Sequence, residues 1–279
     1  LVGGYLLYAY DFTTTYVVLT VVTLAAFALV FAFLRDNPGG RKDPEESGGV
    51  ETFRSLIGLP LLRSLVTFRF TFSVGKMAVI IFLPIYARTE FGISAFAIGW
   101  IMAGGKLTKA LTQGYVGDLT DRFGGKHRFV ALGALLYGIG TAMVPLAALA
   151  EGTLDPVTVA YLGDTQTLGG AFFALFAAYS LLGVADSIRL PASMALFVEE
   201  GEAYDSVASA MSLRSISWKI GQVTGPVMVG SVMDFFSTEI GFLVAAGFIA
   251  FATTAFWWQA SRAAAVRDGP ADPAPSETG

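Results

Sequence analysis

Residues 117–126 read Gly-Asp-Leu-Thr-Asp-Arg-Phe-Gly-Gly-Lys and lie between two long apolar runs. Glycine takes positive φ angles without steric cost, so Gly117 and Gly124 predict a tight reversal between two helices. The same stretch and the residues just after it are densely charged, with Asp118, Asp121, Arg122, Lys126 and Arg128. We therefore expect a pair of helices whose charged connection lies at one face of a membrane.

The composition supports a membrane setting. Apolar residues make up 54% of the 279 residues and charged residues only 14%, whereas soluble domains carry roughly 25% charged residues. A helix needs about 20 apolar residues to cross a bilayer, and backbone groups inside lipid must be paired within the helix. Seven runs meet this need, near residues 12–34, 65–87, 94–116, 128–150, 167–188, 206–232 and 238–259. The fold class expected is an all-α integral membrane protein.

The charged connection carries a recognisable pattern. Six of its positions follow Gly-x-Leu-x-Asp-Arg-x-Gly-x-Lys, at Gly117, Leu119, Asp121, Arg122, Gly124 and Lys126. This pattern resembles the cytoplasmic loop motif of the major facilitator superfamily, which links the second and third helices of each six-helix half. Gly125 departs from it, because the family usually has a basic residue there. The alternative is a chance basic loop between unrelated helices.

Basic residues at the helix ends predict the orientation. They gather in alternate connections, at Arg35, Arg41, Lys42, Arg54 and Arg63, then at Arg122, Lys126 and Arg128, then at Arg189, and finally at Arg262 and Arg267 in the tail. The opposite connections, 88–93, 151–166 and 233–237, hold only Arg88. By the positive-inside rule, we expect a multi-pass protein of the cell membrane with a cytoplasmic C-terminus.

The resemblance implies a division of the chain into four parts. Residues 1–34 would be the end of an N-terminal half (the tail of helix five and helix six), 35–64 the cytoplasmic connection, 65–260 a six-helix C-terminal half, and 261–279 a disordered tail. The chain would then hold helices 6 to 12 of a twelve-helix fold, with its partner half absent. The alternative is a complete seven-helix protein such as a receptor. Within the connection, the spacing of Val50, Phe53, Leu56 and Ile57 predicts a short amphipathic helix on the membrane surface.

Polar stripes inside three of the runs suggest where chemistry occurs. Residues three, four or seven apart share a helix face, and three such sets are Arg69, Ser73 and Lys76; Lys106, Lys109 and Gln113; and Ser215, Lys219 and Gln222. Lys76, Lys106 and Lys219 are expected near the middle of the bilayer, where a lysine facing lipid costs roughly 2.5 to 3.5 kcal/mol. Arg69, Lys109 and Arg214 are expected nearer the cytoplasmic ends, within reach of headgroups or water.

Two interpretations of the three lysines stay open. In the family, substrate binds near the midplane between the halves, so Lys76, Lys106 and Lys219, with Ser73 and Gln222, would line a cavity that binds an organic or phosphorylated anion. Alternatively, the lysines pair with carboxylates of the absent half. Asp186, expected toward the cytoplasmic end of its run, is the nearest candidate for proton coupling, although pairing with Arg189 or Arg214 is the favoured interpretation.

Glycine, proline and the loop motif carry the expected mechanical roles. Gly221, Gly225 and Pro226 follow Lys219 on one helix, and small residues there favour close helix packing while proline permits a bend. The resemblance implies that Asp121 gates transport by contacting the positive end of a helix of the other half, together with Arg122, Gly117, Gly124 and Lys126.

Several classes of function are excluded. The chain has no cysteine, a single histidine in the charged turn (His127), and a net charge of −4 without a basic cluster for nucleic acid. We expect no cofactor, no metal and no enzymatic activity, because no nucleophile motif or phosphate-binding loop occurs. The partners expected are the lipid bilayer and a small-molecule substrate. The function predicted is transport by alternating access, and the alternative is a truncated or sensor-like relative that binds without transporting.

Overall fold

The computed structural model describes residues 2–33, 50–161 and 164–267, with only the backbone placed for some of them. Residues 35–49 of the predicted connection and residues 268–279 of the predicted tail lie outside the described residues.

Helices make up nearly all of the described chain. Each of the seven predicted spans corresponds to a long helix, so the all-α membrane class is confirmed. In chain order the elements are α1 (Val2–Ala9), α2 (Phe12–Phe33), α3 (Val50–Gly58), α4 (Pro60–Phe91), α5 (Ala95–Phe123), α6 (Lys126–Met143), a 3₁₀ turn (Val144–Leu146), α7 (Ala147–Ala150), β1 (Val157–Tyr161), β2 (Asp164–Leu168), α8 (Gly170–Ala203), α9 (Val207–Phe235) and α10 (Thr238–Arg267).

Five of the described helices are both long and apolar enough to cross a membrane: α2, α4, α6 with its continuation to Ala150, α8 and α10. The helices α5 and α9 are also long, at 29 residues each, but fall outside this set. Both carry charged residues along their length, including Lys106 and Lys109 on α5 and Lys219 on α9.

Two boundaries differ from the sequence prediction. The helix α8 continues to Ala203, fifteen residues beyond the predicted end at 188, because polar side chains in its second half, such as Arg189 and Ser193, are buried against other helices. Because such residues lower the local hydropathy, a prediction from hydropathy alone ends the span before them. Residues 157–161 and 164–168, expected mostly as a loop, form two antiparallel strands in which Val157 pairs with Leu168.

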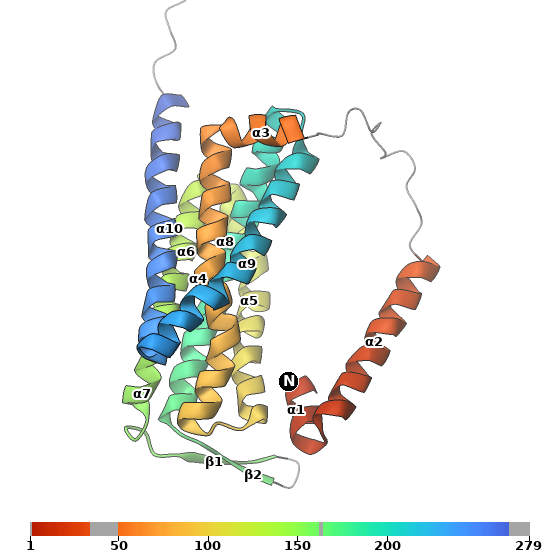
Figure 1. Ribbon diagram of the computed structural model, residues 1–279, viewed down its shortest axis with the longest axis vertical. Coiled ribbons are helices and arrows are strands. Elements are labelled where there is room, and N and C mark those ends of the chain that lie inside the picture. Colours follow the sequence, from red (N-terminus) through yellow and green to blue (C-terminus); the bar gives the residue numbers. More distant parts are fainter. Residues whose placement is uncertain (1, 34–49, 162–163, 268–279) are drawn as a thin grey trace, which may run out of the picture.

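The bundle is centred on α4 and α8 (Figure 1). The helices α9 and α10 pack against α4, while α5 and α6 pack against α8. The helix α2 lies apart from the bundle and is exposed along almost its whole length, whereas α1 contacts α5. The short helix α3 crosses one end of α4, and the two strands lie at the opposite end.

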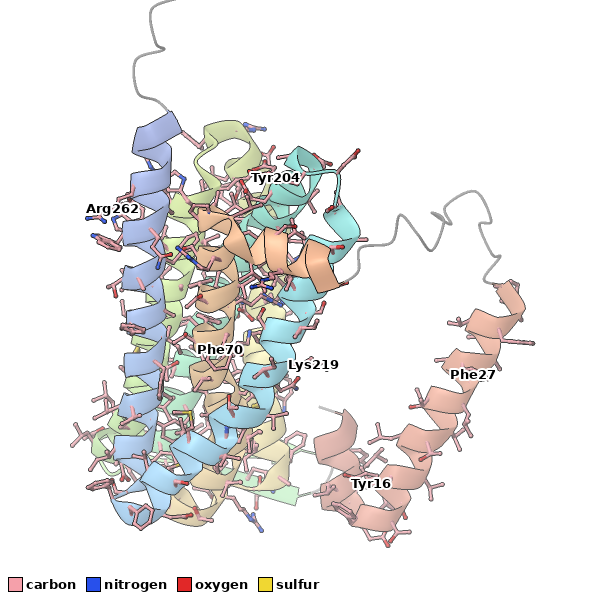
Figure 2. The ribbon with its side chains drawn as sticks, turned by 45° about the horizontal axis from the view of Figure 1, so that its top comes forward. Tyr16, Phe27, Phe70, Tyr204, Lys219 and Arg262 are labelled. Atoms are coloured by element: carbon pink, nitrogen blue, oxygen red, sulfur yellow. The ribbon has the colours of Figure 1, made fainter. Side chains whose placement is uncertain are left out.

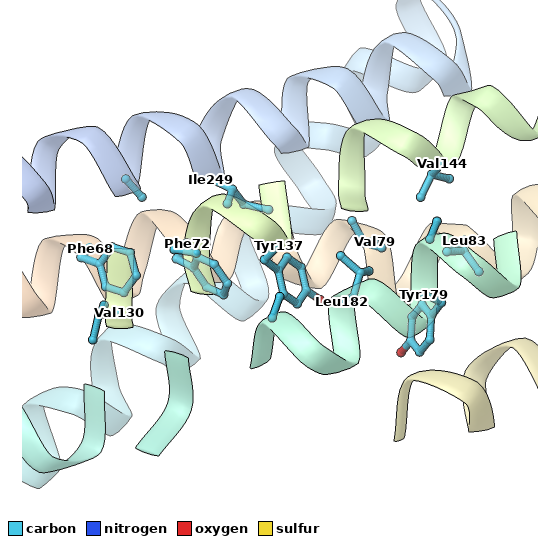
Figure 3. Packing of buried hydrophobic residues seen from close by; sticks show 14 of the residues in the cluster. Phe68, Phe72, Val79, Leu83, Val130, Tyr137, Val144, Tyr179, Leu182 and Ile249 are labelled. Atoms are coloured by element: carbon cyan, nitrogen blue, oxygen red, sulfur yellow. The ribbon is translucent and has the colours of Figure 1, made fainter. Parts of the chain in front are cut away.

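Aromatic and branched side chains fill the space between α4, α6, α8 and α10 (Figure 3). The ring centroids of Phe68 and Phe256 are 5.0 Å apart, and those of Phe72 and Tyr137 are 5.2 Å apart in an edge-on arrangement, a geometry that aromatic pairs favour. Because lipid is as apolar as these side chains, close packing rather than water exclusion holds such helices together.

Glycines allow α9 to approach α4 closely. A Cβ atom added at Gly225 would lie 2.8 Å from the Cα of Val74, and one added at Gly221 would lie 2.6 Å from the carbonyl oxygen of Phe70. Gly221 and Gly225, which the sequence predicts as packing residues of this helix, therefore both lie at the contact with α4. Pro226, next to Gly225 within α9, has no N–H to donate to the preceding turn.

The turn between α5 and α6 uses one of the two glycines expected, Gly124, and one that was not, Gly125. Gly117 lies inside α5, six residues before its end, so the prediction that it forms the reversal is wrong. Gly124 and Gly125 make the turn, each with φ of +62°. Gly125, which departs from the loop pattern by lacking a basic side chain, takes the left-handed conformation that precedes α6.

The amphipathic segment in the long connection forms the predicted helix, α3. Its Leu56 is 2% exposed and joins the hydrophobic core, whereas Arg54 is exposed. Its location on a membrane surface stays a prediction.

Candidate functional site

A lysine, an aspartate and an arginine meet inside the bundle. The Lys76 ammonium, midway along α4, contacts Oδ2 of Asp186, midway along α8. The Arg189 guanidinium, one turn further on α8, donates from Nη2 to Oδ1 of Asp186 at 2.9 Å. The Lys76 and Asp186 side chains are 11% and 12% exposed, and that of Arg189 only 1%. We call these three residues the ion triad.

Aromatic rings complete the surroundings of the ion triad. The Lys76 Nζ lies 5.0 Å from the ring centroid of Tyr137 and 5.7 Å from that of Trp218, and the Arg189 Cζ lies 4.1 Å from that of Phe72. The negative face of an aromatic ring attracts a cation, the more so where water is excluded. The two cations of the triad therefore contact one carboxylate and three aromatic rings.

Two more arginines lie beside the triad. The Arg69 Nε on α4 donates to the carbonyl oxygen of Arg214 on α9 at 2.9 Å, and its guanidinium lies 4.8 Å from the Trp218 ring centroid. Arg69 is 6% exposed, so the prediction that it reaches headgroups or water is wrong. It is buried because α9 packs across α4 and brings Trp218 over it.

The ion triad corrects three further expectations. Lys76 pairs with a carboxylate of its own chain, so it needs neither a substrate anion nor a partner half as its counter-charge. Asp186 lies at the level of Lys76, midway along α8, rather than toward the end of its helix. Arg189 lies inside α8 and not in a connection, so it does not count toward the orientation. The favoured pairing of Asp186 with Arg189 is present, in addition to Lys76.

The other residues of the predicted binding set make no described hydrogen bond or ion pair with the ion triad. Lys106 on α5 and Lys219 on α9 are exposed, and Gln222 is half-buried; Figure 2 labels Lys219 on α9. Ser73 is fully buried between α4 and α9, where its hydroxyl donates to the carbonyl oxygens of Phe70 at 2.9 Å and Trp218 at 3.3 Å. Its position is that of a packing residue. No group of three or more histidine, aspartate or glutamate side chains in the described part of the chain could hold a metal ion.

Residues 65–278 match the model of the Major Facilitator Superfamily. The chain belongs to this family. The match covers the helices α4 to α10, which include the ion triad and the loop motif. The Major Facilitator chain is therefore a multi-pass membrane protein of a transporter family.

Curated relatives are named as an MFS-type transporter and as multidrug resistance proteins. The chain is 28% identical over 165 residues to an uncharacterised MFS-type transporter of Yersinia enterocolitica, a match that covers 59% of this chain and 36% of that protein. It is 25% identical to the multidrug resistance protein MdtG of Dickeya zeae and 27% identical to that of Klebsiella pneumoniae, over 89% and 90% of this chain. Each MdtG match covers 56% of that relative, so the chain spans about half the length of the curated relatives it matches.

The loop motif of this Major Facilitator chain makes two ion pairs. Arg122 pairs with Asp118 one turn before it on α5, with both side chains largely exposed. Lys126, at the start of α6, pairs with Glu199 near the end of α8, and so ties the turn to a third helix. The Asp121 side chain lies outside the described part of the structure. Its gating role therefore stays a prediction.

Some site residues could not be singled out from the sequence. Tyr137 and Trp218 face the Lys76 ammonium, yet each is an ordinary aromatic residue in an apolar run. The spacing of Asp186 and Arg189, three residues apart, was a usable signal for their pairing. The contact of Lys76 with Asp186 joins residues 110 positions apart and follows only from the packing of α4 on α8.

Proposed function

We propose that the protein is a secondary transporter that moves a small organic molecule across the cell membrane by alternating access. The observation that carries this proposal is the family match over α4 to α10. The ion triad supports it, because an ionisable group inside a membrane bundle is costly and points by default to a function.

We propose the following arrangement for transport. Residues 65–260 act as one six-helix half, residues 35–64 as the connection to it, and residues 1–34 as the end of another half that lies outside this chain. The two halves rock about a site near the midplane. The basic residues of the α5–α6 turn and of the tail favour a cytoplasmic C-terminus.

The substrate class we propose is an organic anion with an apolar body. Lys106 and Lys219 are exposed on α5 and α9, and large apolar side chains adjoin them, such as Leu107 at 58% and Ile220 at 51% exposure. A surface that combines a cation with apolar groups suits an amphipathic anion. The MdtG relatives are named for resistance to many drugs, which favours a broad rather than a narrow choice of apolar body.

Transport in proteoliposomes tests the substrate class. The protein, produced from its whole reading frame, should accumulate an amphipathic organic anion, and Lys106→Gln should reduce the rate at least tenfold at subsaturating substrate. Arg128→Gln, an equal charge change at the exposed start of α6, is the control and should leave the rate within twofold. Unchanged anion kinetics in Lys106→Gln would refute the anionic site. Uptake of neutral or cationic compounds alone would leave a transporter with another substrate, and ligand binding without uptake would favour a sensor.

A further inference from the structure

Three arginines, one of them the Arg189 of the ion triad and two beside it, have few acceptors for their N–H groups. Arg69, Arg189 and Arg214, from α4, α8 and α9, act on one another electrostatically. The Nη1 of Arg69, the Nε and Nη1 of Arg189 and the Nε of Arg214 are buried and have no hydrogen-bond partner among the described residues. Arg69 and Arg189 are 6% and 1% exposed, so their donors are withdrawn from bulk water without a protein acceptor in the described chain.

The nearby carboxylate does not supply what is missing. Asp186 accepts from Lys76 with Oδ2 and from Arg189 with Oδ1, and no described hydrogen bond joins it to Arg69 or Arg214. Lys76 and the three arginines carry four positive charges against the single negative charge of Asp186, which leaves a net charge of +3. An unpaired buried charge or donor is expensive, and like charges packed together add to the cost.

The unpartnered groups have the chemistry of an oxyanion receptor. A guanidinium presents parallel N–H donors that match two oxygens of a carboxylate or phosphate group. Ser193 adds to the set, since it lies one turn beyond Arg189 on α8, is fully buried, and has a hydroxyl without a partner in the described chain. Unpartnered donors thus come from three helices, and the three arginines among them are close enough to act on one another electrostatically.

We propose that Arg69, Arg189 and Arg214 form a binding site for a small oxyanion taken from solution, a phosphate, sulfate or carboxylate group. A dissolved solute is favoured over a lipid headgroup because Arg69 lies nine residues inside α4, about 14 Å along its axis at 1.5 Å per residue. The site differs from Lys106 and Lys219, and it does not depend on which substrate the transporter carries.

Thermal unfolding of the purified protein in an uncharged maltoside detergent tests the site, with inorganic phosphate as the probe and chloride at matched ionic strength as the reference. A ligand at ten times its Kd stabilises the folded state by about 1.4 kcal/mol, which corresponds to a rise in Tm of roughly 3 to 6 °C for a protein near this size. Equal melting curves in phosphate and chloride up to 100 mM would overturn the proposal.

Two variants and one control separate this site from general salt effects. Arg69→Gln and the half-buried Arg214→Gln should each lose most of the phosphate-dependent rise. Arg63→Gln removes an exposed arginine from the same helix as Arg69 and should keep it. An equal rise in all three variants would overturn the assignment, because phosphate would then act elsewhere. Since Arg214 contacts neither Asp186 nor Lys76 in any described ion pair or hydrogen bond, its variant should fold even if Arg69→Gln does not.

Discussion

Replacing Asp186 by asparagine should destabilise the protein strongly. The change keeps the shape of the side chain but removes the negative charge that pairs with both Lys76 and Arg189. These two cations would then remain 11% and 1% exposed in their side chains, with only aromatic rings beside them. Removing one partner of a buried ion pair costs about 3 to 5 kcal/mol, mainly because the other charge is left uncompensated.

Lys76→Gln should cost less than Asp186→Asn. Asp186 would keep Arg189 as a partner, so the loss is that of one charged hydrogen bond, about 1.5 to 3 kcal/mol. The double variant should lose about 1 to 3 kcal/mol less unfolding free energy than the two single variants lose together, because the residues are in direct contact. The order of stability is thus wild type, Lys76→Gln, then Asp186→Asn.

Apparent Tm values in detergent at a fixed heating rate measure this order. At about 2 to 4 °C per kcal/mol for a chain near this size, Asp186→Asn should lower Tm by roughly 6 to 20 °C. Asp118→Asn, the same chemical change in an exposed ion pair on α5, should lower it by about 4 °C or less, since such pairs contribute at most about 1 kcal/mol. An Asp186→Asn protein as stable as the Asp118→Asn protein would refute the buried triad.

Two further changes test the packing and the loop motif. Gly225→Ala should lower Tm by roughly 2 to 12 °C, because the added methyl group would collide with the α4 backbone and overpacking costs about 1 to 3 kcal/mol. The control is Gly247→Ala on α10, where no atom lies within 4 Å of the added methyl group and Tm should stay unchanged or rise. Equal effects at both sites would contradict the close contact between α9 and α4. Asp121→Asn should slow uptake in proteoliposomes at least fivefold with little change in substrate affinity, and wild-type turnover would contradict its gating role.

The sequence predicted the helices well and their partners poorly. Apolar runs identify all seven long helices because each must satisfy its backbone inside lipid. The end of α8 was placed too early because hydropathy cannot tell a polar residue buried by a neighbouring helix, such as Arg189, from one at a membrane surface. The strands Val157–Tyr161 and Asp164–Leu168 were missed because the alternation of polar and apolar residues in the first of them is short.

The candidate site was also predicted within single helices but not between helices. Spacing on one helix is visible in the sequence, so Asp186 with Arg189 was a favoured pair. Contacts between helices depend on their rotation and depth, so the partner of Lys76 and the burial of Arg69 under Trp218 were not predictable. The loop pattern predicted a turn, but only the backbone shows that Gly125, rather than Gly117, takes the positive φ angle.

Cysteine accessibility tests alternating access most directly, and the chain has no cysteine of its own to interfere. Ala110 is exposed on α5, one turn beyond Lys106. With any cysteine outside these 279 residues replaced by serine, Ala110→Cys would place a single thiol on the proposed substrate-facing surface. In oriented vesicles carrying the protein of the whole reading frame, a membrane-impermeant maleimide should label this thiol from either side, and substrate should shift the ratio of the two rates severalfold. Labelling from one side only, at a ratio that substrate leaves unchanged, would contradict transport by alternating access.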